Sequence, residues 1–96
     1  MVGTPYYLSP EVVQSNAYTN ATDIWSMGVI LYEMVALKPP FDGQSLQMLA
    51  MKIVRGAYNP ITGNYSAPLK GLIKDCLSVA ATRRPTVNQI LKMPLI

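Results

Sequence analysis

The chain reads DIWSMGVILYEMVAL from Asp23 to Leu37, its most apolar stretch. Its length and flanks predict a helix over these residues, capped by Thr22 or Asp23 and ended by Lys38-Pro39-Pro40. Apolar residues cover all faces of this helix, which is typical of a helix buried on every side. The stretch is too short to cross a bilayer and carries Glu33. We therefore predict a helix at the centre of a large core.

Three further helices are predicted on its C-terminal side. The first runs from about Ser45 to Arg55 and is stopped by Gly56. The second is capped by Ser66 and repeats apolar residues at the spacing of one helix face, namely Leu69, Leu72, Ile73, Cys76 and Leu77. The last begins with the capping box Thr86-Val87-Asn88-Gln89 and runs to about Met93.

A short helix is predicted before the apolar stretch, from Pro10 to about Gln14, with Ser9 as its N-cap. No segment alternates apolar and polar residues as a strand does, so the expected fold class is mainly α. Helices with one apolar face each can cover two or three sides of the central helix. The uncovered side implies either a missing piece of protein or a binding partner.

Composition excludes several classes of protein. Only 14% of the residues are charged, and the net charge of +3 comes from basic residues spread along the chain. A nucleic-acid-binding surface usually shows a denser basic stripe, so no nucleic-acid partner is expected. One cysteine and no histidine argue against a disulfide framework and a Cys/His metal site. Without a signal peptide or membrane segment, we expect an intracellular protein, cytoplasmic or nuclear.

Three sequence blocks occur in an order that is typical of one protein family. They are Gly3-Thr4-Pro5-Tyr6-Tyr7-Leu8-Ser9-Pro10-Glu11, then Asp23-Ile24-Trp25-Ser26-Met27-Gly28, and finally Arg84-Pro85-Thr86. Together they resemble the C-terminal half of a serine/threonine protein kinase domain, with Ser9-Pro10-Glu11 in place of the usual Ala-Pro-Glu. The first block is similar to the NIMA-related kinase (NEK) family in particular. The resemblance covers residues 1–96 and implies a partial kinase C-lobe, from the substrate-binding loop to the last helix.

The resemblance also implies roles for particular residues. Gly3, Thr4, Pro5, Tyr6, Tyr7 and Leu8 match the loop that binds the peptide substrate, and Thr4 matches the threonine that contacts the catalytic aspartate and lysine. Glu11 and Arg84 match a buried ion pair that clamps the fold. Asp23, Trp25, Gly28, Ile30 and Met34 match scaffold positions: Asp23 holds the catalytic loop, and Ile30 and Met34 support the adenine-binding column.

The residues that perform kinase chemistry have no match in this chain. The six glycines form no G-x-G-x-x-G loop, and without histidine the His-Arg-Asp catalytic loop cannot be present. Phe41-Asp42-Gly43 has the residues of the metal-binding Asp-Phe-Gly in the wrong order and follows the central helix. No catalytic residue, metal ligand or cofactor is therefore expected for this chain alone, although ATP and Mg²⁺ serve the intact family.

Two functions agree with this sequence. The chain is either part of a NEK-like serine/threonine kinase, which phosphorylates protein serine or threonine when intact, or a truncated, pseudokinase-like module that binds without chemistry. Its partner is accordingly a protein or peptide substrate, or the missing N-lobe and catalytic loop of a kinase domain. In both cases we expect these 96 residues to be inactive on their own.

Overall fold

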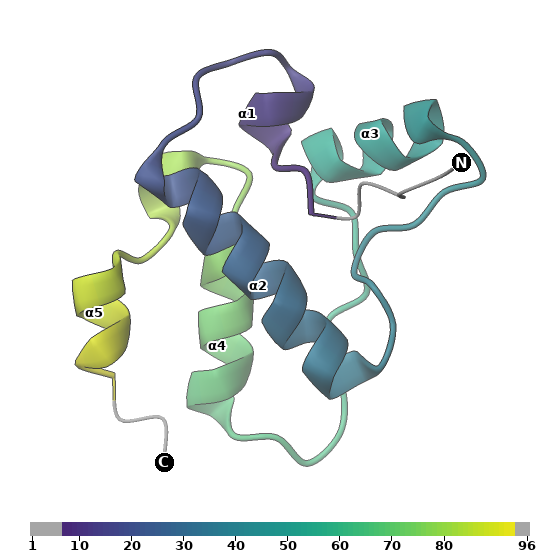
Figure 1. The fold of residues 1–96 in the computed structure, drawn as a ribbon. Helices are drawn as coiled ribbons and strands as arrows, with labels where there is room; N and C mark the ends of the chain where they lie inside the picture. Colours follow the sequence, from purple (N-terminus) through teal and green to yellow (C-terminus); the bar gives the residue numbers. More distant parts are fainter. Residues whose placement is uncertain (1–6, 94–96) are drawn as a thin grey trace.

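A computed structural model describes residues 7–93 of the chain. Its elements are α1 (Pro10–Val13), α2 (Asn20–Ala36), α3 (Leu46–Arg55), α4 (Ala67–Cys76), the 3₁₀ helix η1 (Ala81–Arg83) and α5 (Val87–Leu91). Figure 1 shows α2 as the longest helix, running diagonally across α4, with α1 and α3 above it and α5 to the left of α4. No strand occurs within the described residues, which confirms the mainly α fold class.

Side-chain caps set most helix starts where the sequence places them. The hydroxyl oxygens of Ser9, Ser45, Ser66 and Thr86 each accept a hydrogen bond from a backbone N–H three residues further on. Thr86 and Gln89 form the expected reciprocal capping box. α3 ends at Gly56, whose positive φ of 66° is readily adopted by glycine.

Two boundaries and one element differ from the sequence-based predictions. α2 begins at Asn20, so neither Thr22 nor Asp23 is its N-cap; that residue is Thr19, whose backbone N–H donates to the Thr22 hydroxyl oxygen at 3.0 Å. Thr22, at the third helical position, thus accepts from the N–H of the N-cap residue, as the N3 side chain does in a capping box. α5 ends at Leu91, and η1 follows no pattern that the sequence displays.

The core forms around one side of α2. Trp25, Val29 and Tyr32 pack with residues from the following loop, α3 and α4, namely Phe41, Leu49, Ile53, Ile73 and Leu77. A smaller cluster joins Ile24 to Leu72 and Cys76. Burying these side chains supplies the main stabilising free energy of the fold, at about 25 cal/mol for each Å² of apolar surface removed from water.

Gly28 lets α2 and α4 approach closely. A Cβ atom placed on Gly28 would lie 2.6 Å from the Cβ of Cys76 and 3.3 Å from a methyl group of Leu77. Real Cβ atoms do not come so close, so any larger residue at position 28 would push the two helices apart.

The opposite side of α2 carries large apolar side chains that no described residue covers. Ile30 is 48% exposed, Met34 is 70% exposed and Leu37 is 88% exposed. We call these three residues the open face of α2. The apolar circumference of this helix thus exceeds what residues 7–93 can bury, as the sequence pattern indicated. None of the helices in this range is long and apolar enough to cross a membrane.

The close approach at Gly28 generates a stability prediction. Gly28→Ala should lower the free energy of unfolding by about 1–3 kcal/mol, because the added methyl group overpacks the contact between α2 and α4. Gly71→Ala in α4 is the matched control: its Cβ would meet no atom within 4 Å, so it should raise stability by up to about 1 kcal/mol through helix propensity. Urea unfolding of both variants tests this, and equal effects would contradict it.

Candidate functional site

The expected substrate loop falls partly within the described structure. Gly3, Thr4, Pro5 and Tyr6 lie outside the described residues, whereas Tyr7 and Leu8 lie directly before α1. Tyr7 is 45% exposed, and Leu8 packs against the main core cluster. Ser9 and Pro10 are buried, so the chain is anchored immediately after this loop.

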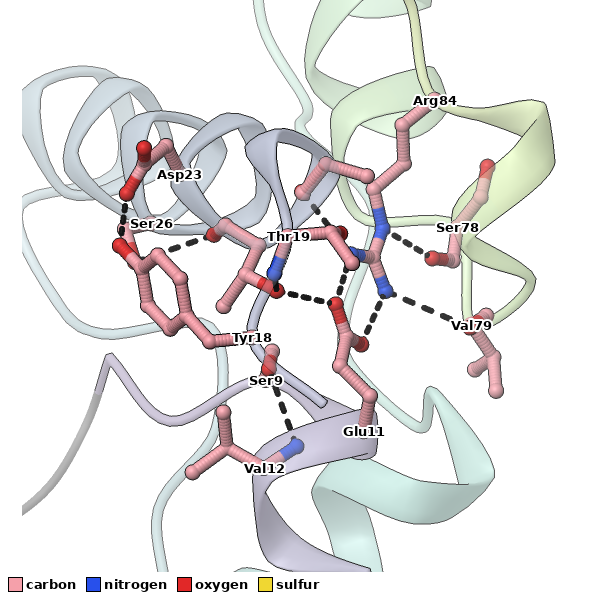
Figure 2. A network of polar contacts seen from close by, with 12 residues as sticks. Ser9, Glu11, Val12, Tyr18, Thr19, Asp23, Ser26, Ser78, Val79 and Arg84 are labelled. Carbon is pink, nitrogen blue, oxygen red and sulfur yellow. Dashed lines mark hydrogen bonds and ion pairs between the residues drawn. The ribbon is translucent and has the colours of Figure 1, made fainter. Parts of the chain in front are cut away.

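Glu11 and Arg84, which the resemblance pairs, form a two-pronged ion pair across 73 positions of sequence. Arg84 Nη1 donates to Glu11 Oε2 at 2.6 Å, and Arg84 Nη2 donates to Glu11 Oε1 at 2.8 Å (Figure 2). The Arg84 side chain is fully buried, and that of Glu11 is 13% exposed. A planar guanidinium suits this parallel geometry with a carboxylate. We call the pair the Glu11–Arg84 clamp.

The remaining donors of Arg84 bind backbone carbonyls in other segments. Nη1 also donates to the carbonyl of Ala21 at 2.9 Å, and Nε donates to that of Ser78 at 2.9 Å. Nη2 reaches the carbonyl of Val79 at 3.3 Å (Figure 2). The guanidinium carbon lies 5.0 Å from the centre of the Trp25 ring, a cation–π contact. One side chain therefore joins α1, the start of α2 and the segment after α4.

Glu11 is held ionised by these neighbours. Hydrogen bonding from Arg84 lowers its pKa from the ordinary 4.5 to about 2, although partial burial acts in the opposite direction. The Thr22 hydroxyl adds a hydrogen bond of 2.8 Å to Glu11 Oε2. Sequence reasoning missed Thr22 as a partner, since it treated this residue only as a helix cap.

The scaffold residues of α2 lie on different sides of the helix. Asp23 is exposed in the first turn, where it accepts a hydrogen bond from the Tyr18 hydroxyl (Figure 2). Trp25 is fully buried and stacks on Phe41 with ring centres 5.5 Å apart. Gly28 faces α4, whereas Ile30 and Met34 belong to the open face. The structure therefore brings Trp25 to the clamp and leaves Asp23, Ile30 and Met34 apart from it.

Two buried polar atoms have no hydrogen-bond partner among residues 7–93. They are Nε1 of Trp25 and Oε1 of Glu33, both on α2. Buried polar groups are almost always hydrogen-bonded in folded proteins, so each unpaired atom calls for an explanation. Since the described residues already enclose both atoms, they mark polar groups buried within the fold itself.

Other residues with reactive or metal-binding groups have structural surroundings. Phe41 is in the core, and the Asp42 carboxylate accepts from the backbone N–H of Gly43 at 2.8 Å. Burial raises the pKa of the Cys76 thiol to about 11, which keeps it protonated and unreactive near neutral pH. Within residues 7–93 no three histidine, cysteine, aspartate or glutamate side chains gather to hold a metal ion.

The clamp generates a stability prediction. Glu11→Ala should lower the free energy of unfolding by about 3–5 kcal/mol, because it leaves the buried Arg84 guanidinium without its counter-charge. Asp75→Ala removes an exposed carboxylate of α4 and should change stability by less than about 0.5 kcal/mol. Denaturant unfolding followed by circular dichroism measures both. Similar small losses in the two variants would show that the clamp contributes little.

The lowered pKa of Glu11 also predicts a pH dependence of stability. Because its pKa is about 2 in the folded chain and near 4.5 when unfolded, its contribution is fully present above pH 4.5. This stability is lost as the pH falls from 4.5 towards 2. Glu11→Gln should remove this part of the slope in a plot of unfolding free energy against pH between 6 and 3. Parallel curves for wild type and variant would contradict the assignment.

Comparison with known proteins identifies the family. The profile of the protein kinase domain matches residues 1–96. Human serine/threonine-protein kinase Nek5 is 47% identical over 95 residues, which cover 99% of this chain and 13% of that protein. The probable serine/threonine-protein kinase nek3 of Dictyostelium discoideum is 45% identical, over 100% of this chain and 9% of that protein.

A fungal relative extends the same similarity. The G2-specific protein kinase nim-1 of Neurospora crassa is 43% identical over 99% of this chain and 11% of its own length. The chain therefore spans roughly a tenth of the length of the curated relatives named here. The match along the whole chain confirms the resemblance drawn from the three sequence blocks. This chain belongs to the protein kinase domain family and is similar to its Nek-type serine/threonine kinases.

Proposed function

We propose that this chain is the substrate-binding and scaffolding part of a NEK-like serine/threonine kinase domain, covering the C-lobe from the substrate loop to the last helix. In the intact domain, the γ-phosphate of ATP passes to a serine or threonine hydroxyl of a protein. The observation that carries the proposal is the Glu11–Arg84 clamp, which fixes the residues directly after the matched substrate loop. Kinase catalysis is mainly positioning and electrostatics, so a rigidly held peptide loop contributes to it directly.

The proposed substrate contacts lie in the segment from Gly3 to Leu8. Tyr7 supplies an exposed aromatic wall at the end of this segment, and Leu8 ties it to the core. Thr4 is proposed to orient the catalytic aspartate and lysine, which lie outside this chain. An extended peptide bound beside Tyr7 would present its hydroxyl towards those groups.

The phosphate-transfer groups themselves are assigned to residues outside this chain. No described residues gather to bind a metal ion, and the sequence contains neither a histidine nor a G-x-G-x-x-G loop. The chain therefore offers no fit for Mg-ATP, and we derive no transfer step from its own residues. Its role is to bind the peptide and to support the catalytic segments.

The α2 helix supplies that support in our proposal. Asp23 points out of the first turn and is proposed to bind the backbone of the catalytic loop once it is in place. The open face of α2 is proposed to pack beneath the adenine-binding column.

One observation favours a second functional hypothesis, in which the chain is a non-catalytic binding module. The open face exposes two large apolar side chains on α2 and a third at its C-cap, which suits a protein interface as well as an intramolecular contact. Coding sequence upstream of Met1 separates the two readings. An open frame with His-Arg-Asp and Asp-Phe-Gly motifs supports the kinase, and a stop codon directly before Met1 supports the module.

A chimera tests the kinase proposal. In this chimera, residues 1–96 take the place of the matching segment of human Nek5, to which they are 47% identical. We expect the chimera to transfer phosphate from Mg-ATP to a serine or threonine peptide, because the substituted segment supplies only the substrate loop and scaffold. Thr4→Ala should lower kcat by at least about tenfold, through misplaced catalytic groups. Radiolabelled phosphate incorporation measures both rates.

Controls make the result decisive. Val87→Ala, an exposed position in α5, should leave kcat and KM unchanged. A chimera with an unchanged unfolding midpoint and no transferase activity would overturn the kinase proposal and favour the binding module.

A further inference from the structure

A pocket lies between α4 and the loop that joins α3 to α4, and neither the clamp residues nor Tyr7 and Leu8 line it. Its volume is about 460 Å³, within the range of pockets that bind small ligands or single side chains of a peptide. Tyr58, Ile61 and Ile73 give it apolar walls, and Lys70 and Lys74 stand at its edge on α4. In Figure 1 the loop from α3 leads into the lower end of α4.

No ion pair neutralises the two lysines of this pocket within residues 7–93, although an anion is near: the pKa of Tyr58 is raised by burial and, less strongly, by charges that include the Asp75 carboxylate next to Lys74. Lys70 Nζ donates one hydrogen bond to the carbonyl of Gly63 at 3.0 Å, which fixes it over the loop and leaves its other N–H groups available. The chain has only five carboxylates, all within residues 7–93, and none of them lines the pocket. Among the described residues the sole ion pair is the Glu11–Arg84 clamp, so neither lysine has an anionic partner there.

Gly71 lines the pocket, and helix packing does not require a glycine at this position. It lies inside α4, where a glycine costs about 1 kcal/mol relative to alanine. A Cβ atom at Gly71 would meet no other atom within 4 Å, in contrast to Gly28, where helix packing requires the missing side chain. Glycine inside an element without a packing reason is a feature of places where a ligand approaches the backbone.

We propose that this pocket is a docking site for an acidic segment of a partner protein, which inserts one large apolar side chain between Tyr58, Ile61 and Ile73. The two carboxylates of that segment then pair with Lys70 and Lys74. This site is separate from the substrate loop and does not depend on the proposed kinase function.

The spacing of the lysines favours an extended peptide. Residues four apart on a helix are separated by about 6 Å along its axis. Alternate side chains of an extended chain lie on the same side, at about 6.6–6.8 Å. Acidic residues at alternate positions therefore match the two ammonium groups, and a phenylalanine or leucine two positions further along, on the same side of the peptide, reaches the apolar walls. The exposed ammonium groups also steer an acidic partner towards the pocket.

NMR titration of the full chain with two peptides tests the proposal. The probes are the blocked hexapeptides Gly-Phe-Gly-Glu-Gly-Glu and Glu-Gly-Glu-Gly-Phe-Gly, which cover both chain directions and place all three side chains on one side of an extended chain. We expect saturable amide shifts centred on Tyr58, Gly71 and Lys74 for at least one of them. Replacing the phenylalanine by glycine, or both glutamates by glutamine, should weaken that peptide's binding by about tenfold.

Variants of the chain separate the site from general charge attraction. The double variant Lys70→Glu/Lys74→Glu should weaken binding by about tenfold or more. Lys52→Glu/Lys92→Glu changes the net charge equally at residues outside this pocket and should weaken it less than twofold. Gly71→Phe should abolish binding by filling the pocket, and its unfolding midpoint shows whether the fold is kept; if it is not, the lysine variants decide.

Three results would overturn the proposal. One is the absence of saturable shifts at the pocket with both peptides at millimolar concentration. Another is equal weakening by the two double lysine variants, which would indicate non-specific attraction to a basic chain. The third is binding of decanoate at the same amides without binding of either peptide, which would make the pocket a fatty-acid site instead.

Discussion

The constraint on which the rest of the structure depends is the burial of the Arg84 guanidinium. A buried charge is costly unless it is paired and hydrogen-bonded, and here the Glu11 carboxylate and three backbone carbonyls satisfy it. Those acceptors belong to segments far apart in the sequence, so satisfying one side chain fixes how they meet. The orientation of α1, and with it the exit of the substrate loop at Leu8, follows from this single arrangement.

The second constraint is the central helix α2. Gly28 allows it to pack closely against α4. The Trp25 ring stacks on Phe41 of the core and also makes a cation–π contact with the Arg84 guanidinium, so one aromatic side chain connects the apolar core to the clamp. The open face of α2 then remains as apolar surface that residues 7–93 do not cover. In our proposal this surface supports the catalytic segments of a kinase domain on the free side of the helix.

Much of this arrangement follows from the sequence, and the reasons for the rest are physical. Serine and threonine caps, with Gly56 as a stop, place most helix ends, since they satisfy backbone groups locally. The first residue of α2 could not be predicted from these rules, because Thr19 and Thr22 are both residue types that cap helices well. The Glu11–Arg84 pairing came from family resemblance, since no periodicity relates residues 73 apart. The carbonyls that bind Arg84 carry no side-chain signature and required the structure.

A double-mutant cycle at Glu11 and Arg84 tests the central role of this ion pair most directly. Urea unfolding of Glu11→Gln, Arg84→Met and the double variant yields the coupling free energy between the two side chains. We predict a coupling of about 2–3 kcal/mol, because either single change leaves the other partner buried without its counterpart. Additive losses, with a coupling near zero, would mean that the fold holds together by apolar packing alone.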